Sequence, residues 1–316
     1  MTKLDRLVEQ WLQAEVAFGV LEVPIPKAKV QALREKAKAV AGQAAAAAKA
    51  ATGVRPPATV APRTAARATP APPARPAASA AIRPAPAPEP ITLKLATPIK
   101  DLPPAPAGKL ADEPQLSPEQ KQTRMADLEK AAIAELSKHL GGSANRVVFG
   151  EGDAAASLMF IGEGPGAEED ATGRPFVGRS GQLLDKMIGA MGFTRPQVYI
   201  ANITKLRCAE PDPMNPNRLK DRPPTSEEAA LGLPWLHQQI AIVQPRVIVT
   251  LGAAALCFLR GEKLPVTQVR GQWLDYRGVP LMPTFHPSYV LRNYTTETRA
   301  KVWSDLKLVM QRLSQG

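Results

Sequence analysis

Residues that could bind or hydrolyse a ligand follow short apolar runs in the second half of the chain. The first group is the glycine-rich, acidic stretch Gly162–Asp170, and the others are Asn202, Gly252 and His286-Pro287-Ser288. A carboxylate can place a water molecule, an amide donates and accepts hydrogen bonds at once, and an imidazole can act as a donor. Residues just past the carboxyl ends of parallel strands meet at one edge of a sheet. The pattern therefore predicts one site that combines these groups.

The glycine-rich loop does not match the known phosphate loops. The glycines in Gly162–Gly166 expose bare backbone that a ligand can approach closely. The last glycine of the dinucleotide fingerprint is missing, no Gly-Lys-Ser/Thr follows, and the acids after the glycines would repel phosphate. Taken singly, Phe176 is also explained as a core residue, Asn202 as a turn cap and His286 as a satisfied buried histidine.

The elements that would position these groups alternate between strand-like and helix-like patterns. Apolar runs typical of buried strands lie at 158–161, 197–201, 246–251 and 280–285. Helical patterns lie at 183–191, 226–243, 253–260 and 296–313. This alternation predicts an α/β fold with three α/β/α layers and a short, mainly parallel, four-stranded central sheet. We expect Val266–Tyr276 to form a small hairpin that turns at Arg270-Gly271.

Composition divides the chain into three parts. Residues 1–50 are expected to form an N-terminal helical segment, which could dock on the main domain or on a partner. Residues 51–116 are an Ala/Pro-rich linker, expected to be disordered because it cannot fill a core. Its arginines either hold DNA phosphates loosely or belong to a solvated spacer. The catalytic domain is expected at 117–316 and begins with the capping-box pattern Ser117-Pro118-Glu119-Gln120.

Charge and cysteine content restrict the class of protein. The 316-residue chain has a formal net charge of +11, which favours polyanionic partners and nucleic acid above all. Its two cysteines, Cys208 and Cys257, exclude a disulfide framework and fit a reducing compartment. There is no signal-peptide pattern at the start, and no run approaches the roughly 20 apolar residues of a membrane span. We therefore expect a cytoplasmic monomer that does not bind membranes.

Several ordered motifs together resemble one family. They are GEGPGAEED (162–170), GRPFVG (173–178), SGQLLDKMI (180–188), an asparagine after a strand (Asn202) and HPSYVLR (286–292). The set resembles the uracil-DNA glycosylase superfamily, and most nearly its family 4, or thermophile-type, branch. The resemblance covers about residue 147 to the C-terminus. It implies a DNA glycosylase, a hydrolase that flips uracil out of DNA and starts base excision repair.

The resemblance also implies a role for each residue of the base pocket. Phe176 would stack on the flipped base, and such stacking contributes about 1–3 kcal/mol. Asn202 would read the uracil edge, because its amide matches N3–H and O4 when neighbours fix its orientation. The backbone of Gly164, Pro165 and Gly166 would approach the uracil carbonyls. His286 would donate a hydrogen bond to O2 as negative charge develops there.

The resemblance gives two candidates for the residue that positions water, and three residues that would contact DNA. Glu163 or Glu169 would position the attacking water, since the aspartate that does so in the best-studied branch falls at Gly164. Glu169 could alternatively block the methyl group of thymine. Ser288, Tyr289 and Arg292 would contact DNA: the serine and arginine would hold phosphate, and Tyr289–Leu291 would press on the minor groove.

One family feature is not matched. Family 4 enzymes usually hold a [4Fe–4S] cluster on four cysteines. The corresponding positions here fall near Glu135, Lys138, Leu206 and Gly232, with Cys208 displaced by two residues and Cys257 on a helix elsewhere. We therefore expect no metal and no cofactor. The 207–224 loop also departs from the family's shorter version, so its DNA contacts stay undefined.

Two other functions remain open from the sequence. One is a catalytically weak relative that binds uracil or DNA without cleaving. The other is a small-nucleotide hydrolase with the same pocket, although the arginine-bearing N-terminal region argues against it. Excision of uracil from an oligonucleotide would separate these alternatives.

Overall fold

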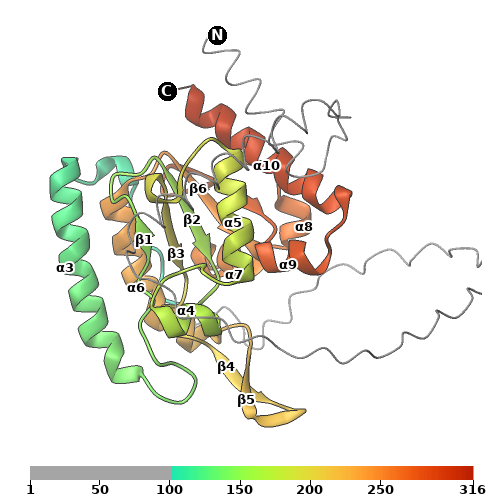
Figure 1. Ribbon diagram of the computed structural model, residues 1–316. Coiled ribbons are helices and arrows are strands. Elements are labelled where there is room, and N and C mark those ends of the chain that lie inside the picture. Colours follow the sequence, from blue (N-terminus) through green and yellow to red (C-terminus); the bar gives the residue numbers. More distant parts are fainter. Residues whose placement is uncertain (1–101, 316) are drawn as a thin grey trace, which may run out of the picture. The chain divides into compact units, whose positions relative to one another are not determined.

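The computed structural model describes residues 102–315, and all of them belong to one compact unit. The functions expected of residues 1–50, and of the linker up to residue 101, lie outside the described residues. The described part has a six-stranded sheet in the order β1-β3-β2-β6-β8-β7 (Figure 1). Its elements are β1 (Glu151–Gly152), β2 (Leu158–Gly162), β3 (Tyr199–Asn202), β6 (Val247–Leu251), β7 (Leu274–Tyr276) and β8 (Val279–Thr284).

The four central strands are parallel, as the sequence predicts, and two short antiparallel strands extend the sheet. β3, β2, β6 and β8 pair in parallel, whereas β1 and β7 pair antiparallel with β3 and β8. The predicted α/β class and mainly parallel sheet are confirmed. The edge strands were missed because two or three residues carry too little periodicity to be recognised.

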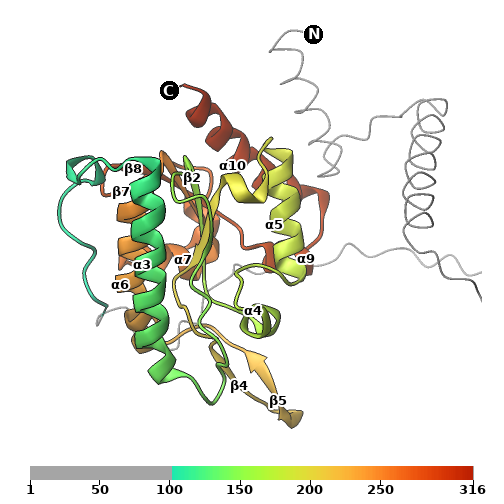
Figure 2. The same ribbon diagram turned by 60° about the vertical axis from the view of Figure 1, so that its left-hand side comes forward.

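Helices cover both faces of the sheet and complete the three layers. One face is covered by α3 (Pro118–Leu136), α6 (Ser226–Val243) and α7 (Gly252–Arg260), and the other by α5 (Arg179–Ala190), α9 (Pro287–Arg292) and α10 (Thr296–Ser314). Figures 1 and 2 show α3 and α6 on one side of the sheet and α5 and α10 on the other. Alternate residues of β2 belong to the hydrophobic cores on the two faces of the sheet. Met159 and Ile161 face α6, and Leu158 and Phe160 face α5.

The start of α3 confirms the predicted capping box. The hydroxyl of Ser117 accepts a hydrogen bond from the Gln120 backbone N–H at 3.3 Å, and the Gln120 side chain accepts from the Ser117 N–H at 2.9 Å. Residues before it also pack on the domain. Leu110 is buried, and its N–H donates to the carbonyl of Arg277 at 2.8 Å. Part of the segment assigned to the linker at 51–116 therefore contacts the folded unit.

The predicted hairpin at Val266–Tyr276 is wrong. Val266–Val269 forms the short helix α8, and β7 pairs instead with β8 through a turn at Arg277-Gly278. Both turn residues have positive φ, +53° and +85°, which is the backbone that a two-residue hairpin loop requires. The 207–224 loop contains a second hairpin, β4 (Ala209–Asp212) with β5 (Asn215–Asp221), which projects from the body in Figure 1.

No helix among residues 102–315 is long and apolar enough to cross a membrane.

In Figure 1, α4 (Ala167–Thr172) and the β4–β5 hairpin lie at the same end of the sheet. This is the end at which β2, β3, β6 and β8 terminate, and it carries the residues that the sequence marks for chemistry.

Two helical glycines predict opposite effects of the same substitution. At Gly232 in α6, a Cβ atom would lie 2.1 Å from the carbonyl oxygen of Ile203, so Gly232→Ala should push α6 off the end of β3. Overpacking of this kind destabilises by about 1–3 kcal/mol, although alanine is the better helix former. At Gly189 in α5 a Cβ would meet nothing within 4 Å. Gly189→Ala should therefore stabilise by up to about 1 kcal/mol. Urea unfolding of both variants tests the packing, and a stabilised Gly232→Ala would contradict it.

Candidate active site

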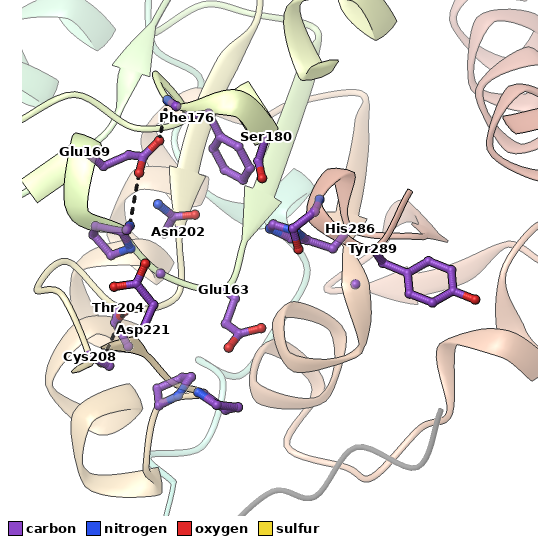
Figure 3. Close-up of a pocket in the computed structure, with 18 of the residues that line it drawn as sticks. Glu163, Glu169, Phe176, Ser180, Asn202, Thr204, Cys208, Asp221, His286 and Tyr289 are labelled. Atoms are coloured by element: carbon purple, nitrogen blue, oxygen red, sulfur yellow. Dashed lines mark hydrogen bonds between the residues drawn. The ribbon is translucent and has the colours of Figure 1, made fainter. Parts of the chain in front are cut away.

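A cavity of about 580 Å³ opens at the carboxyl ends of the parallel strands. Every residue proposed for the site from the sequence lines it. These are Glu163, Gly164, Pro165, Gly166, Glu169, Phe176, Asn202, His286, Ser288, Tyr289 and Arg292. Figure 3 shows that the phenyl ring, the amide and the imidazole surround one space, with the Glu163 carboxylate at its border. The rule that ligands bind where parallel strands end therefore located the cavity correctly.

Pairing of β2 with β3 sets the base of the cavity. Gly162 is opposite Asn202 in the parallel register. The ladder continues past the strands, because the N–H of Ile203 donates to the carbonyl of Gly162 at 3.0 Å and that of Thr204 to the carbonyl of Glu163 at 3.1 Å. Asn202 and Glu163 are thereby held on adjacent backbones at the rim.

Phe176 forms one wall and has an unusual backbone. Its φ is +50°, a value that costs a non-glycine residue about 1–3 kcal/mol and persists only where the surroundings enforce it. The ring fills the space over Gly162, where an added Cβ would be 2.4 Å from the ring and 2.4 Å from Asn202 Oδ1. The ring centroid lies 5.7 Å from that of His286. Phe176 is thus buried, as a core residue would be, yet it faces the cavity.

The Glu169 carboxylate accepts hydrogen bonds from backbone N–H groups around it. Its Oε1 accepts hydrogen bonds from the N–H groups of Val177 at 2.8 Å and Gly178 at 2.9 Å, and its Oε2 accepts from that of Gly166 at 3.1 Å (Figure 3). A carboxylate that accepts such bonds at both oxygens has little capacity left to activate water. The contacts instead join the glycine-rich loop to the Phe176 loop.

The Asn202 amide has a buried acceptor without a partner. Among residues 102–315, Oδ1 has no hydrogen-bond donor although the side chain is buried. An unsatisfied buried acceptor costs about 1–3 kcal/mol, so the site favours a ligand that brings an N–H group. The backbone carbonyl of Asn202 is held from behind by Lys205 Nζ at 2.9 Å.

Lys205 is a supporting residue that the sequence reasoning missed. It is buried, and its ammonium also donates to Gln239 Oε1 at 2.6 Å. Burial lowers the Lys205 pKa to about 7. The only signal in the sequence is a lysine three residues after Asn202, where a solvated lysine would look the same.

His286 is held in one tautomer by its own helix. It is the N-cap of α9, and the backbone N–H of Ser288 donates to its Nδ1 at 3.1 Å. Ser288 Oγ lies 2.7 Å from the same nitrogen. Burial lowers the His286 pKa to about 4, with a smaller effect from the Arg292 charge, so the ring is neutral at pH 7. Because Nδ1 accepts a hydrogen bond, the proton is on Nε2, which is the nitrogen available to donate.

The pKa of the Glu163 carboxyl group is shifted towards neutral pH. Burial raises its pKa to about 7, and the charge of Arg292 opposes the shift. A carboxyl group with this pKa can take up a proton near neutral pH, which is the property required of a general base.

The outer rim carries the residues expected to meet DNA. Arg292 is exposed and forms no ion pair among the described residues. Ser288 is less free than the sequence suggested, since both its N–H and its hydroxyl contact His286. The Tyr289 ring packs against Phe285, with ring centroids 4.9 Å apart. The rim thus presents the unpaired Arg292 guanidinium near the neutral imidazole.

A second cavity, of about 220 Å³, lies where the family resemblance would put a metal cluster. Leu206, Cys208 and Gly232 line it together with Leu136 and His139. Cys208 is the single thiol there, and burial raises its pKa to about 12, so it is not a thiolate at neutral pH. Residues 102–315 contain no group of three or more His, Cys, Asp or Glu side chains placed to bind a metal ion. These residues do not fit a cluster that needs four thiolates.

Comparison with known proteins identifies the family. The model of the uracil DNA glycosylase superfamily matches residues 149–307. A type-4 uracil-DNA glycosylase of Thermotoga maritima is 47% identical over 163 residues, which make up 51% of this chain and 80% of that protein. A type-4 enzyme of Pyrobaculum aerophilum is 41% identical over 153 residues, which make up 46% of this chain and 73% of that protein. With matched motifs around a shared cavity and relatives of this identity and coverage, the chain belongs to the type-4 branch of the uracil-DNA glycosylase superfamily.

Proposed function

We propose that this protein hydrolyses the N-glycosidic bond of uracil in DNA, the first step of base excision repair. The observation that carries the proposal is the unpartnered buried oxygen of Asn202, in the cavity that the Phe176 ring and the neutral His286 also line. Uracil offers an N–H at N3 and a carbonyl at O4, which match the oxygen and the N–H₂ of one amide. Cytosine presents an acceptor at N3 and a donor at N4, so with the amide held in this orientation it would leave the same oxygen unsatisfied.

The reaction needs negative charge stabilised on the base and a water molecule delivered to the sugar. When the bond between C1′ and N1 breaks, its electron pair moves onto the base and charge gathers at O2. His286 Nε2–H donates to that oxygen, and the neutral ring does so without transferring a proton first. The oxocarbenium-like sugar is then captured by water, which gives its proton to Glu163.

Glu163 is preferred to Glu169 as the residue that positions water. The Glu169 carboxylate already accepts backbone N–H groups at both oxygens, whereas no hydrogen bond to the Glu163 carboxylate is present in the described part of the chain. Glu169 would act on the base pocket through the loop that it supports. A contact with the methyl group of thymine remains compatible with its place on the cavity wall.

DNA is the proposed partner, held at the rim by the Arg292 guanidinium and by Tyr289 on α9. A monomer, a cytoplasmic location and DNA or protein contacts by residues 1–101 stay predictions from the sequence. We also propose that this member works without an iron–sulfur cluster, because the whole chain has two cysteines.

Uracil excision tests the function directly. Wild-type protein should convert a uracil-containing oligonucleotide to one with an alkali-labile abasic site. His286→Ala should lower the single-turnover rate by about 10²–10³-fold, since it removes the donor to the developing charge. Asn202→Ala should lower it as well, because the base is no longer oriented. The exposed His139 is a matched control, and His139→Ala should keep wild-type activity. Binding of uracil-containing DNA without cleavage by any variant would favour the non-catalytic relative.

The pH profile tests the assignment of Glu163. Burial disfavours its ionised form, so the base form appears as pH rises through about 7. Single-turnover rates should therefore rise with pH and level off above that value, while His286, with a pKa of about 4, stays neutral throughout. Glu163→Gln should be slow and lose this rise. A wild-type rate that is independent of pH across neutrality would exclude Glu163 as the base.

Iron analysis tests the absence of a cluster. Purified active protein should contain no stoichiometric iron or acid-labile sulfide and should lack the visible absorption of a cluster. Chelators should leave its activity unchanged. Stoichiometric iron that is lost together with activity would contradict the proposal.

A further inference from the structure

The loop that presents Phe176 is held from both sides by charged side chains. On one side, Glu169 accepts hydrogen bonds from the N–H groups of Val177 and Gly178. On the other side, the guanidinium of Arg195 donates to the carbonyl of Phe176 at 3.1 Å and to the carbonyl of Pro175. Consecutive peptide groups from 175 to 178 are therefore bonded to two ions of opposite charge.

These hydrogen bonds hold Phe176 in its strained backbone conformation. A φ of +50° is unfavourable for a phenylalanine, so the loop would relax if its peptide groups were free. Relaxation would rotate the ring away from Gly162 and out of its place in the cavity wall. Hydrogen bonds to charged groups are the stronger kind, which suits them to enforcing such a backbone.

Arg195 does not touch the cavity and is itself anchored elsewhere. It follows α5, in the 3₁₀ turn Arg195–Gln197 just before β3. Its Nε lies 3.1 Å from Glu151 on β1 and its Nη1 lies 2.7 Å from Asp185 on α5. The side chain is 16% exposed. One guanidinium thus connects an edge strand, a helix and the Phe176 loop.

We propose that Arg195 is a positioning residue for base recognition, which acts by holding the Phe176 ring in its stacking position. The inference rests on the proposed uracil-DNA glycosylase function and extends it to a residue outside the pocket. Lysine could keep the ionic contacts with Glu151 and Asp185, but a single ammonium lacks the planar fork that reaches both carbonyls. The geometry therefore requires arginine at this position.

Arg174 supplies a matched control. It also binds Glu151, with Nε at 2.8 Å and Nη2 at 2.7 Å from the carboxylate, but makes no hydrogen bond to the carbonyls of Pro175 and Phe176. Arg174→Gln removes an arginine from the same carboxylate and should leave uracil excision unchanged. Arg195→Gln should lower kcat/KM roughly 10- to 100-fold, because misplacing a positioning group by about 1 Å can cost about 10²-fold. Thermal unfolding of each variant, followed by circular dichroism, shows whether it is folded at the assay temperature.

A double-mutant cycle separates positioning from general damage. If Arg195 acts through the Phe176 ring, Arg195→Gln should have little further effect once the ring is gone. The Phe176→Ala/Arg195→Gln protein should then match Phe176→Ala within about twofold. Losses that multiply in the double variant, or an Arg195→Gln protein with wild-type kcat/KM, would overturn the proposal.

Arg195→Lys covers the case in which the glutamine variant does not fold. It keeps a positive charge between Glu151 and Asp185, and is expected to fold yet to lose activity as predicted for Arg195→Gln. Full activity of the lysine variant would also overturn the proposal. If wild-type protein excised no uracil at all, the proposed function itself would fail, and that result is distinct from an active enzyme that is insensitive to Arg195.

Discussion

The site depends on the absence of a side chain at Gly162. The parallel register places Gly162 opposite Asn202. Both the Asn202 amide and the Phe176 ring pack closely against the Gly162 Cα. Any Cβ there would lie 2.4 Å from both the ring edge and Oδ1, which is too close for either to stay in place. Gly252 has the same relation to His286, since a Cβ would lie 2.9 Å from that of the histidine. Bare backbone at two strand ends therefore lets the three proposed recognition groups share one cavity.

The close packing that results also controls the charges. Burial penalises the ionised form of each group, so it lowers the pKa of His286 and raises that of Glu163. The opposite pKa shifts therefore favour the uncharged form of both side chains. In the proposed mechanism, the neutral imidazole is then free to donate to the base as charge develops on it, and Glu163 becomes the general base once its proton is lost near pH 7. Arg292 carries its charge at the exposed rim, where it is available to phosphate.

The sequence predicted those parts of the molecule that depend on local pattern. Apolar runs located the parallel strands, and the rule for strand ends then brought Phe176, Asn202 and His286 into one cavity. Contacts between distant segments could not be read in this way. Arg195 bonds to the carbonyl of Pro175, 20 residues earlier, and nothing in its neighbourhood in the chain indicates the partner.

The acidic loop shows a related limit of sequence reasoning. Glu163 and Glu169 are equivalent candidates in the sequence, because residue type and spacing do not reveal which carboxylate faces backbone N–H groups. The structure separates them through side-chain hydrogen bonds: the Glu169 carboxylate accepts from backbone N–H groups of the glycine-rich loop and of the Phe176 loop, whereas the Glu163 carboxylate accepts none in the described part of the chain. A functional assignment between two nearby acids therefore needs the fold as well as the motif.

The segments near Cys208 are held together by contacts between protein groups. Arg222 makes two hydrogen bonds of 2.7 Å to Glu228, and Ser143 Oγ donates to the carbonyl of Arg207 at 2.9 Å. Partly exposed ion pairs contribute only about 0–1 kcal/mol each, so the Arg222–Glu228 pair alone holds the region weakly. Packing of α6 also holds it, because Gly232 lies directly against the backbone of Ile203. Since Ile203 follows Asn202, the packing of α6 in this region also fixes the strand end that carries the Asn202 amide into the cavity.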